Sequence, residues 1–205
     1  MRTLRAVPIP GEKAELGESP LWDEQHGLLW WIDWARGVIY RSDVAAGASA
    51  VFCVEGLLAA VAPSSAGRIA LAIGHGFAEL DPEDSRVRAL ARAEPDDVES
   101  RMCDGKCDAH GRFWAGTTAL DERSPIGALF VMETDGRVRR VLDHVIVSNG
   151  LCWSLDDRLF YYIDTATRRI DVFDFDLAQG TIAHRRALVE LPPRRRRPGR
   201  PHARQ

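Results

Sequence analysis

The sequence predicts an all-β protein of the β-propeller class, because strand-like runs recur along it with a long period and helical patterns are nearly absent. These runs are dense in aromatic and β-branched residues and are separated by Gly, Asp and Asn turns. Examples are residues 28–33 (LLWWID), 128–133 (ALFVME) and 159–164 (LFYYID). The one candidate helix, around residues 86–99, is short, charged and interrupted by Pro95.

The long period is carried by a signature in which Gly or Asp precedes a hydrophobic run. It begins at Gly27, Gly67, Gly111 and Asp157, so successive signatures lie 40, 44 and 46 residues apart. A period of this length with several strands per unit is typical of a propeller, whose blades are four-stranded sheets around a channel. The chain therefore holds about four blades.

Composition and length limit the possible classes of protein. The chain has 205 residues, of which 45% are hydrophobic and 28% charged, as in an ordinary soluble domain with a core. No apolar run approaches the roughly 20 residues of a membrane-spanning helix, and the N-terminus lacks a secretory signal pattern. The four cysteines are dispersed, which favours reduced thiols. We expect a cytoplasmic protein without a membrane partner.

The last 14 residues, 192–205, differ from the rest of the chain. They contain six arginines and no acid, which leaves 21 basic against 30 acidic residues in 1–191. Three interpretations stay open: an arm that binds nucleic acid, a disordered end, or GC-rich DNA translated in a shifted frame. The Arg, Pro and Gly composition favours the shifted frame, so no nucleic-acid partner is expected.

Chemically useful side chains precede the signature by eight to ten residues in three of the four repeats. They are Glu18, Arg101 with Cys103, and Asn149, whereas the second repeat offers only Ala59. In a propeller this offset falls where the innermost strand of each blade meets the channel mouth, so the polar side chains should converge. A carboxylate and an amide oxygen suit Ca²⁺, Mg²⁺ or Mn²⁺ and are acceptable to Zn²⁺.

Each residue also has an ordinary structural explanation. Glu18 could be a solvated loop carboxylate, Asn149 a turn residue, and Arg101 a partner in a surface ion pair. Asp104 and Asp108 are interpreted as turn formers. The six tryptophans are interpreted as packing between blades rather than as platforms for a sugar ring.

Three ordered motifs resemble the regucalcin/gluconolactonase family, also called senescence-marker proteins. They are E-L-G-E-S-P-L-W-D around Glu18, R-x-x-D-G-K-x-D-x-x-G-R-F-W-A-G-T from Arg101, and S-N-G-L-x-W-S-x-D from Ser148, within a similarity that covers residues 14–191. The resemblance implies a six-bladed propeller that holds one divalent cation, Ca²⁺, Zn²⁺, Mn²⁺ or Mg²⁺, and hydrolyses sugar lactones. It also implies that Glu18 and Asn149 are metal ligands.

The same resemblance assigns substrate contacts to Arg101, to the position of Cys103 and to Asp121. The family motif has an amide where this chain has Cys103, and a thiol is a weak hydrogen-bonding group. The third metal-binding carboxylate of the family, an aspartate that also serves as the proposed base, should fall near residues 195–200, where this chain has arginines.

The expected catalytic aspartate therefore lies beyond the homologous region, and whether the chain is an enzyme stays open. We interpret residues 1–191 as an incomplete, truncated propeller of the lactonase type and residues 192–205 as a frame-shifted tail. The predicted activity is impaired hydrolysis of a sugar lactone. The alternative is a non-catalytic fragment that binds calcium or sugar.

Overall fold

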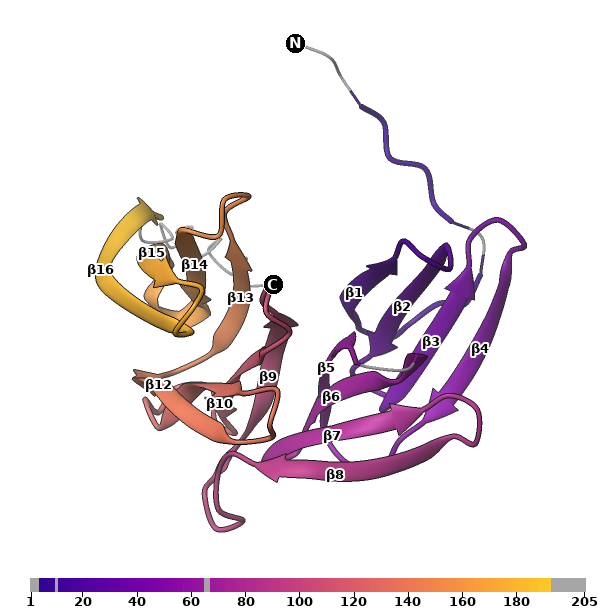
Figure 1. Ribbon diagram of the computed structural model, residues 1–205, viewed down its shortest axis with the longest axis horizontal. Coiled ribbons are helices and arrows are strands. Elements are labelled where there is room, and N and C mark those ends of the chain that lie inside the picture. Colours follow the sequence, from indigo (N-terminus) through magenta and orange to yellow (C-terminus); the bar gives the residue numbers. More distant parts are fainter. Residues whose placement is uncertain (1–3, 10, 65–66, 193–205) are drawn as a thin grey trace, which may run out of the picture.

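The computed structural model describes residues 4–9, 11–64 and 67–192, and its regular structure is built of β-strands. Four antiparallel sheets contain four strands each, and within every sheet the strands are adjacent in chain order. Figure 1 shows the sheets following one another in an arc, with the first strand of each on the inner side. This arrangement confirms four blades of a β-propeller.

The strands divide evenly among the blades. Blade 1 comprises β1 (Gly17–Asp23), β2 (Leu28–Asp33), β3 (Val38–Asp43) and β4 (Ala48–Cys53). Blade 2 comprises β5 (Leu58–Pro63), β6 (Ile69–Ile73), β7 (Gly76–Asp81) and β8 (Arg86–Arg92). Blade 3 comprises β9 (Ser100–Cys107), β10 (Phe113–Ala119), β11 (Gly127–Met132) and β12 (Val138–Val145). Blade 4 comprises β13 (Ser148–Trp153), β14 (Leu159–Asp164), β15 (Arg169–Asp176) and β16 (Thr181–Glu190), with the 3₁₀ turn η2 (Thr165–Thr167) after β14.

The prediction of a candidate helix around residues 86–99 is wrong, because Arg86–Arg92 form β8. This strand pairs with β7 from Asp81↔Arg86 to Gly76↔Arg92 and is the outermost strand of its blade. Most of its side chains are exposed, so the charges that obscured a strand pattern remain in water. Backbone pairing with β7 decides the structure here rather than side-chain periodicity.

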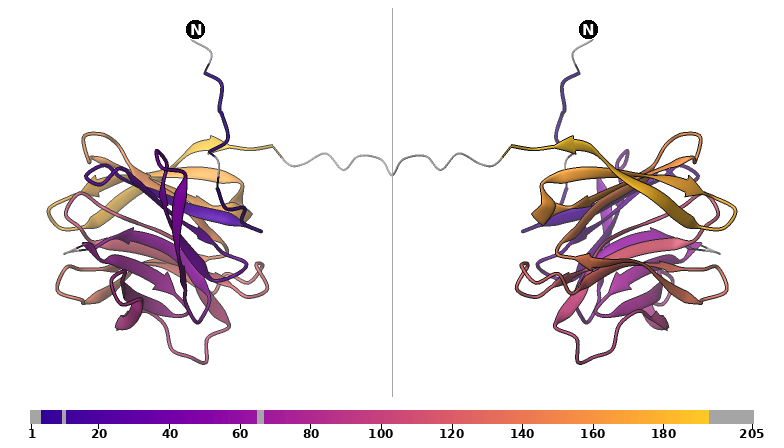
Figure 2. Two further views of the ribbon diagram at one scale, coloured as in Figure 1. Left: turned by 90° about the vertical axis from the view of Figure 1, so that its right-hand side faces the viewer. Right: turned by 90° about the vertical axis from the view of Figure 1, so that its left-hand side faces the viewer.

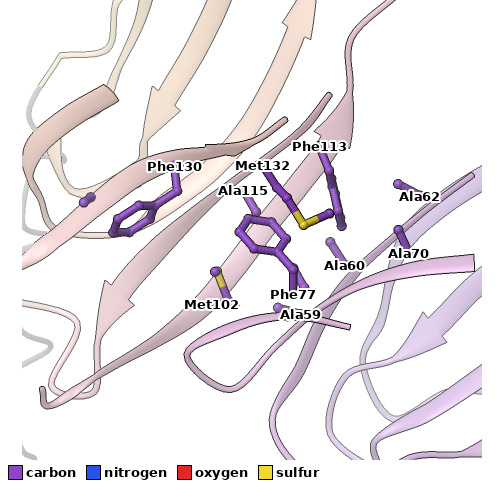
Figure 3. Close-up of a cluster of buried hydrophobic side chains, with 12 residues drawn as sticks. Ala59, Ala60, Ala62, Ala70, Phe77, Met102, Phe113, Ala115, Phe130 and Met132 are labelled. Carbon is purple, nitrogen blue, oxygen red and sulfur yellow. The ribbon is translucent and has the colours of Figure 1, made fainter. Parts of the chain in front are cut away.

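The cores lie between adjacent blades. One cluster joins blades 1 and 2 through residues such as Trp30 and Leu71, and another joins blades 3 and 4 through Trp114 and Phe160. Figure 3 shows the cluster between blades 2 and 3, where Phe77 and Phe113 meet edge to face with ring centroids 5.5 Å apart among several alanines. Burying each large apolar side chain contributes about 1.5–3 kcal/mol, so each blade depends on its neighbour.

The tryptophan prediction holds only in part. Trp30 and Trp114 are buried in these cores, whereas Trp22 is 55% exposed. Trp34 is half-buried and contacts an arginine of blade 3, as described below.

One backbone hydrogen bond recurs in all four blades and fixes the inner strand. The N–H of the residue after the second strand donates to a carbonyl just ahead of the inner strand. The four bonds are Trp34 to Leu16 at 2.9 Å, Gly74 to Leu57 at 3.0 Å, Leu120 to Glu99 at 2.9 Å and Thr165 to Val147 at 2.9 Å. The repeat in the sequence is therefore a repeat in the way each inner strand is anchored.

The two ends of the chain are described only in part. Residues 4–9 are exposed and leave the sheets on the side of blade 1, as the side views of Figure 2 show. The predicted tail at 192–205 lies outside the described residues except for Pro192. In the part of the chain that is described, no helix is long and apolar enough to cross a membrane.

Candidate functional site

Every inner strand contains a β-bulge at the same place, one extra residue relative to the strand beside it. The bulges lie between Glu18 and Leu21, between Leu58 and Ala60, between Met102 and Gly105, and between Ser148 and Leu151. A bulge interrupts the ladder and turns a side chain out of the regular alternation. The repeated offset of the sequence thus corresponds to a repeated bulge. Cys103 and Asn149 lie within their bulges, as Ala59 does, and Glu18 is the paired residue directly before the bulge of β1.

Glu18 lies in the electrostatic field of blade 3. Burial raises the pKa of its carboxyl, the nearby Asp104 carboxylate raises this pKa further, and the Arg101 guanidinium partly opposes the shift. Two carboxylates and one guanidinium from blades 1 and 3 therefore share one region. The predicted convergence of Glu18 and Arg101 is in agreement with this geometry.

Asp104 connects the inner strands of blades 3 and 4. Its Oδ2 accepts a hydrogen bond from the Gly150 N–H at 2.8 Å, and its Oδ1 accepts one from the Gly105 N–H at 2.7 Å. Burial raises the pKa of this carboxyl, which the two N–H groups oppose. The interpretation of Asp104 as a turn former is wrong, since its side chain bridges two blades.

Asp108, by contrast, is confirmed as a turn former. Its Oδ1 accepts from the His110 N–H at 2.9 Å and from the Arg112 N–H at 3.1 Å. Its Oδ2 accepts from Arg112 Nε at 2.6 Å and from Trp114 Nε1 at 2.9 Å. This carboxylate stabilises the turn between β9 and β10.

Cys103 stays protonated in this environment. Burial raises the pKa of its thiol to about 12, and the neighbouring Arg101 charge only partly offsets the effect. A neutral thiol is a weak donor and a weak acceptor. The position that the resemblance assigns to a substrate contact is therefore occupied by a poorly interacting group.

Arg101 is held by contacts from two blades. Its Cζ lies 4.6 Å from the centroid of the Trp34 ring of blade 1. Within blade 3 its Nη2 donates to Glu122 Oε1 at 3.4 Å and its Nη1 donates to the Met102 carbonyl at 3.3 Å. The side chain is only 11% exposed. Neither Trp34 nor Glu122 was predicted as part of the site.

Asn149 is exposed on the bulge of blade 4, between buried Ser148 and Gly150. The loop before it is fixed by buried Asp164, whose carboxylate accepts from the N–H groups of Ile146 and Val147, each at 3.0 Å. The Gly150 N–H bound to Asp104 fixes the other side. The backbone around Asn149 is thus firmly held while its amide remains accessible.

Asp121 engages its own turn instead of the inner strands. Its carboxylate accepts from the hydroxyl of Ser124 at 2.6 Å and from the N–H groups of Arg123 and Ser124, each at 2.8 Å. The Ser124 hydroxyl is the main cause that lowers the pKa of Asp121 to about 2. The next residue, Glu122, is the one that contacts Arg101.

A cavity of about 770 Å³ extends between the inner strands. Glu18 and Asp104 line it, together with Val61 of blade 2 and Gly150 of blade 4. Tyr161, Ile163, Ile170 and Leu188 give blade 4 a largely apolar wall. Carboxylates beside apolar walls form an environment that can orient a small polar ligand.

The donors fit a hard divalent cation only in part. Among the described residues no three His, Cys, Asp or Glu side chains gather closely enough to hold a metal ion. Glu18 and the accessible amide of Asn149 nevertheless offer two hard oxygen ligands, the type that Ca²⁺ and Mg²⁺ prefer. Burial first and the Asp104 carboxylate second raise the pKa of Glu18, and a bound cation would favour the charged form of its carboxyl.

Fold and site together define a class: a β-propeller whose polar residues lie on the bulges of its inner strands. The chain belongs to the family described as SMP-30/Gluconolactonase/LRE-like region, whose model matches residues 16–201. That range extends past residue 191 into the arginine-rich segment. The resemblance carried by the three motifs is therefore confirmed.

Individual relatives agree with this family. Regucalcin of Xenopus laevis is 35% identical over 196 residues, which make up 93% of this chain and 66% of that protein. A luciferin-regenerating enzyme superposes with a TM-score of 0.81 at 28% identity, covering 87% of this chain and 62% of the enzyme. A calcium-binding protein, regucalcin, from Agrobacterium tumefaciens superposes with a TM-score of 0.80 at 23% identity, covering 85% and 59%.

The chain thus spans 66% of the length of the curated regucalcin and less of the two solved structures. Of the residues that sequence reasoning missed, Asp104 could have been found, because it follows Cys103 within the same bulge. Trp34 directly follows the strand that pairs with β1, but no spacing rule marks it as a contact of blade 3. Nothing in the sequence distinguishes Glu122 from Asp121.

Proposed function

We propose that the chain binds one divalent cation and a sugar lactone at the mouth of its channel. Its proposed activity is metal-dependent hydrolysis of that lactone. The observation that carries this proposal is the set of polar bulges in blades 1, 3 and 4, with Glu18, Arg101 and Asn149 on or beside them. Membership in a family named after gluconolactonase supports the substrate class.

In this proposal Glu18 and Asn149 hold one divalent cation per chain, from the set Ca²⁺, Zn²⁺, Mn²⁺ and Mg²⁺. When bound, such an ion polarises an ester carbonyl. Arg101 donates N–H groups to the sugar or to the developing oxyanion. The residue at position 103 and Asp121 complete the proposed substrate contacts, with Cys103 contributing little because its thiol is protonated.

The reaction itself adds water to the lactone carbonyl carbon and breaks the ring C–O bond. The ring oxygen takes a proton to become a hydroxyl, and the product is an aldonate with one proton released. A base must accept a proton from the attacking water, and such a base contributes about 10²- to 10⁴-fold to the rate.

A second candidate, a non-catalytic module that binds calcium or sugar, is supported by the state of Asp104. Both of its oxygens accept backbone N–H groups, so among the described residues this carboxylate is poorly suited to act as the base. Glu18 is assigned to the cation. A cytoplasmic setting is part of both proposals and is supported by four free cysteines.

Calorimetry and a proton-release assay separate these candidates. We expect Mn²⁺ or Ca²⁺ to bind with one site per chain and Glu18→Gln to weaken binding at least about tenfold. Glu24→Gln, an exposed carboxylate in the turn after the same strand, is the matched control and should bind like the unaltered protein. Cation-dependent proton release from δ-gluconolactone supports the lactonase, and binding of cation and gluconate without release supports the binding module. Absence of cation binding contradicts both.

A further inference from the structure

Trp34 lies where blade 1 can influence an arginine of blade 3. It follows β2 directly, at the end of the strand that pairs with the Gly17–Glu18 part of β1. Its backbone N–H donates to the Leu16 carbonyl, and the Asp33 carboxylate beside it accepts from the Glu15 and Leu16 N–H groups at 2.9 and 3.3 Å. The indole therefore projects from a segment that is tied to the start of the inner strand.

The main chain on both sides of Arg101 is fixed by blade 2. The Ser100 carbonyl is 2.8 Å from His75 Nε2, and the Met102 N–H donates to the Gly74 carbonyl at 2.8 Å. The Ser100 hydroxyl donates to the buried carboxylate of Glu94. The backbone position of Arg101 is thus determined, and only the direction of its long side chain remains to be set.

That direction is set mainly by the Trp34 ring. An arginine side chain is long and has many rotamers, so an unsupported guanidinium samples many directions. The distance of 4.6 Å from Arg101 Cζ to the centroid of the Trp34 ring is well inside the range of about 6 Å for an attractive cation–π contact. The Glu122 contact, at 3.4 Å to an exposed carboxylate, is weaker and solvent-screened.

We propose that Trp34 is a positioning residue that holds the Arg101 guanidinium toward blade 1, in the field of Glu18. The ring supports one side of the guanidinium, which leaves the N–H donors that do not bind Met102 or Glu122 available to a ligand. The consequence for ligand binding rests on the proposed function, in which Arg101 contacts the sugar. The contact between Trp34 and Arg101 does not depend on that function.

The test combines two variants of Trp34 with two readouts. In protein labelled with ¹⁵N-arginine, we expect the Arg101 Nε–H signal to be displaced by the ring current of Trp34. The signal is assigned by its loss in Arg101→Lys. Trp34→Leu should move it to the region of solvated arginines, and Trp34→Phe should retain most of the displacement. Trp22→Leu, an exposed tryptophan at the other end of β1, is the matched control and should leave it unchanged.

The second readout is the affinity for gluconate, the product of the proposed reaction, measured by calorimetry with saturating Mn²⁺. Trp34→Leu should weaken gluconate about three- to tenfold while Mn²⁺ affinity is unchanged, and Trp34→Phe should restore most of the loss. Should Trp34→Leu fail to fold, Trp34→Met, which also lacks an aromatic face, takes its place.

An unchanged Arg101 signal in the leucine variant would overturn the proposal, as would a phenylalanine variant that behaves like the leucine variant. If gluconate binds equally well to all variants, the positioning role is wrong even when the signal moves. If the unaltered protein binds no gluconate, the proposed function fails. The Arg101 signal then decides the positioning role alone, because it requires no ligand.

Discussion

The bulge of blade 2 and the bulges of the other three blades share one backbone geometry and differ in chemistry. In all four, the inner strand carries one extra residue and is anchored by the same hydrogen bond from the end of the second strand. Blade 2 has Ala59 at this position, which is 2% exposed and packs in the core against blade 3. Blades 3 and 4 have Cys103 and Asn149 within the bulge, blade 1 has Glu18 directly before it, and none of these three is buried to that degree.

The backbone of the bulge is required by the repeat, whereas the polar side chains are not. An alanine in the bulge needs neither hydration nor a hydrogen-bond partner. In blade 2 the bulged backbone therefore serves packing alone. A carboxylate directly before a bulge loses hydration, as the raised pKa of Glu18 indicates. The fold thus provides four bulges, and we propose that the polar groups at three of them serve ligand binding.

The largest expected effect comes from removing the carboxylate that holds the backbone before the bulge of blade 4. Asp164→Ala should cost about 2–4 kcal/mol of unfolding free energy, because it leaves the backbone N–H groups of Ile146, Val147 and Ala166 without their charged acceptor. Urea denaturation measures this loss. The exposed turn residue Asp156→Ala, at the other end of β14, serves as control and should change stability far less. Equal losses in both variants would mean that Asp164 does not anchor the bulge.

A smaller effect is expected when the charge in blade 1 is removed without altering the backbone. Glu18→Gln without cation should melt at or above the temperature of the unaltered protein, because burial beside Asp104 disfavours the charged carboxyl. With saturating Mn²⁺ the order should reverse, since only the unaltered protein gains binding energy. Scanning calorimetry with and without the ion makes both measurements. A lower melting temperature in both conditions would assign Glu18 a structural role.

The smallest effect concerns the bulge of blade 3. Cys103→Asn replaces a weak thiol by an amide that both donates and accepts, and one neutral hydrogen bond corresponds to about two- to twelvefold in affinity. Gluconate should therefore bind several-fold more tightly, as calorimetry can measure. Cys103→Ala is the control and should not gain affinity. No gain in the asparagine variant would show that position 103 does not face the ligand.

The fold could be predicted from the sequence because the period of 40 to 46 residues reflects one blade, and every blade repeats the same anchoring bond. Strand β8 could not, since an outermost strand with mostly exposed side chains has no hydrophobic pattern of its own. Its structure is decided by pairing with β7.

The site was predictable where it depends on the repeat and unpredictable where it depends on contacts between blades. Glu18, Cys103 and Asn149 follow from the offset. Asp104 reaches from blade 3 to Gly150 in blade 4, and Trp34 reaches from blade 1 to Arg101 in blade 3. No local pattern encodes a distance between segments that are 46 or 67 residues apart in the sequence.

The central claim, that polar bulges of different blades form one cation site, is tested most directly by paramagnetic broadening of backbone amide signals during titration with Mn²⁺. Signals of residues 18–19 and 149–150 should broaden first and together. Glu18→Gln should abolish this effect. Earliest broadening at the acidic turns 23–26 or 81–84, on the far ends of the strands from Glu18, would contradict it.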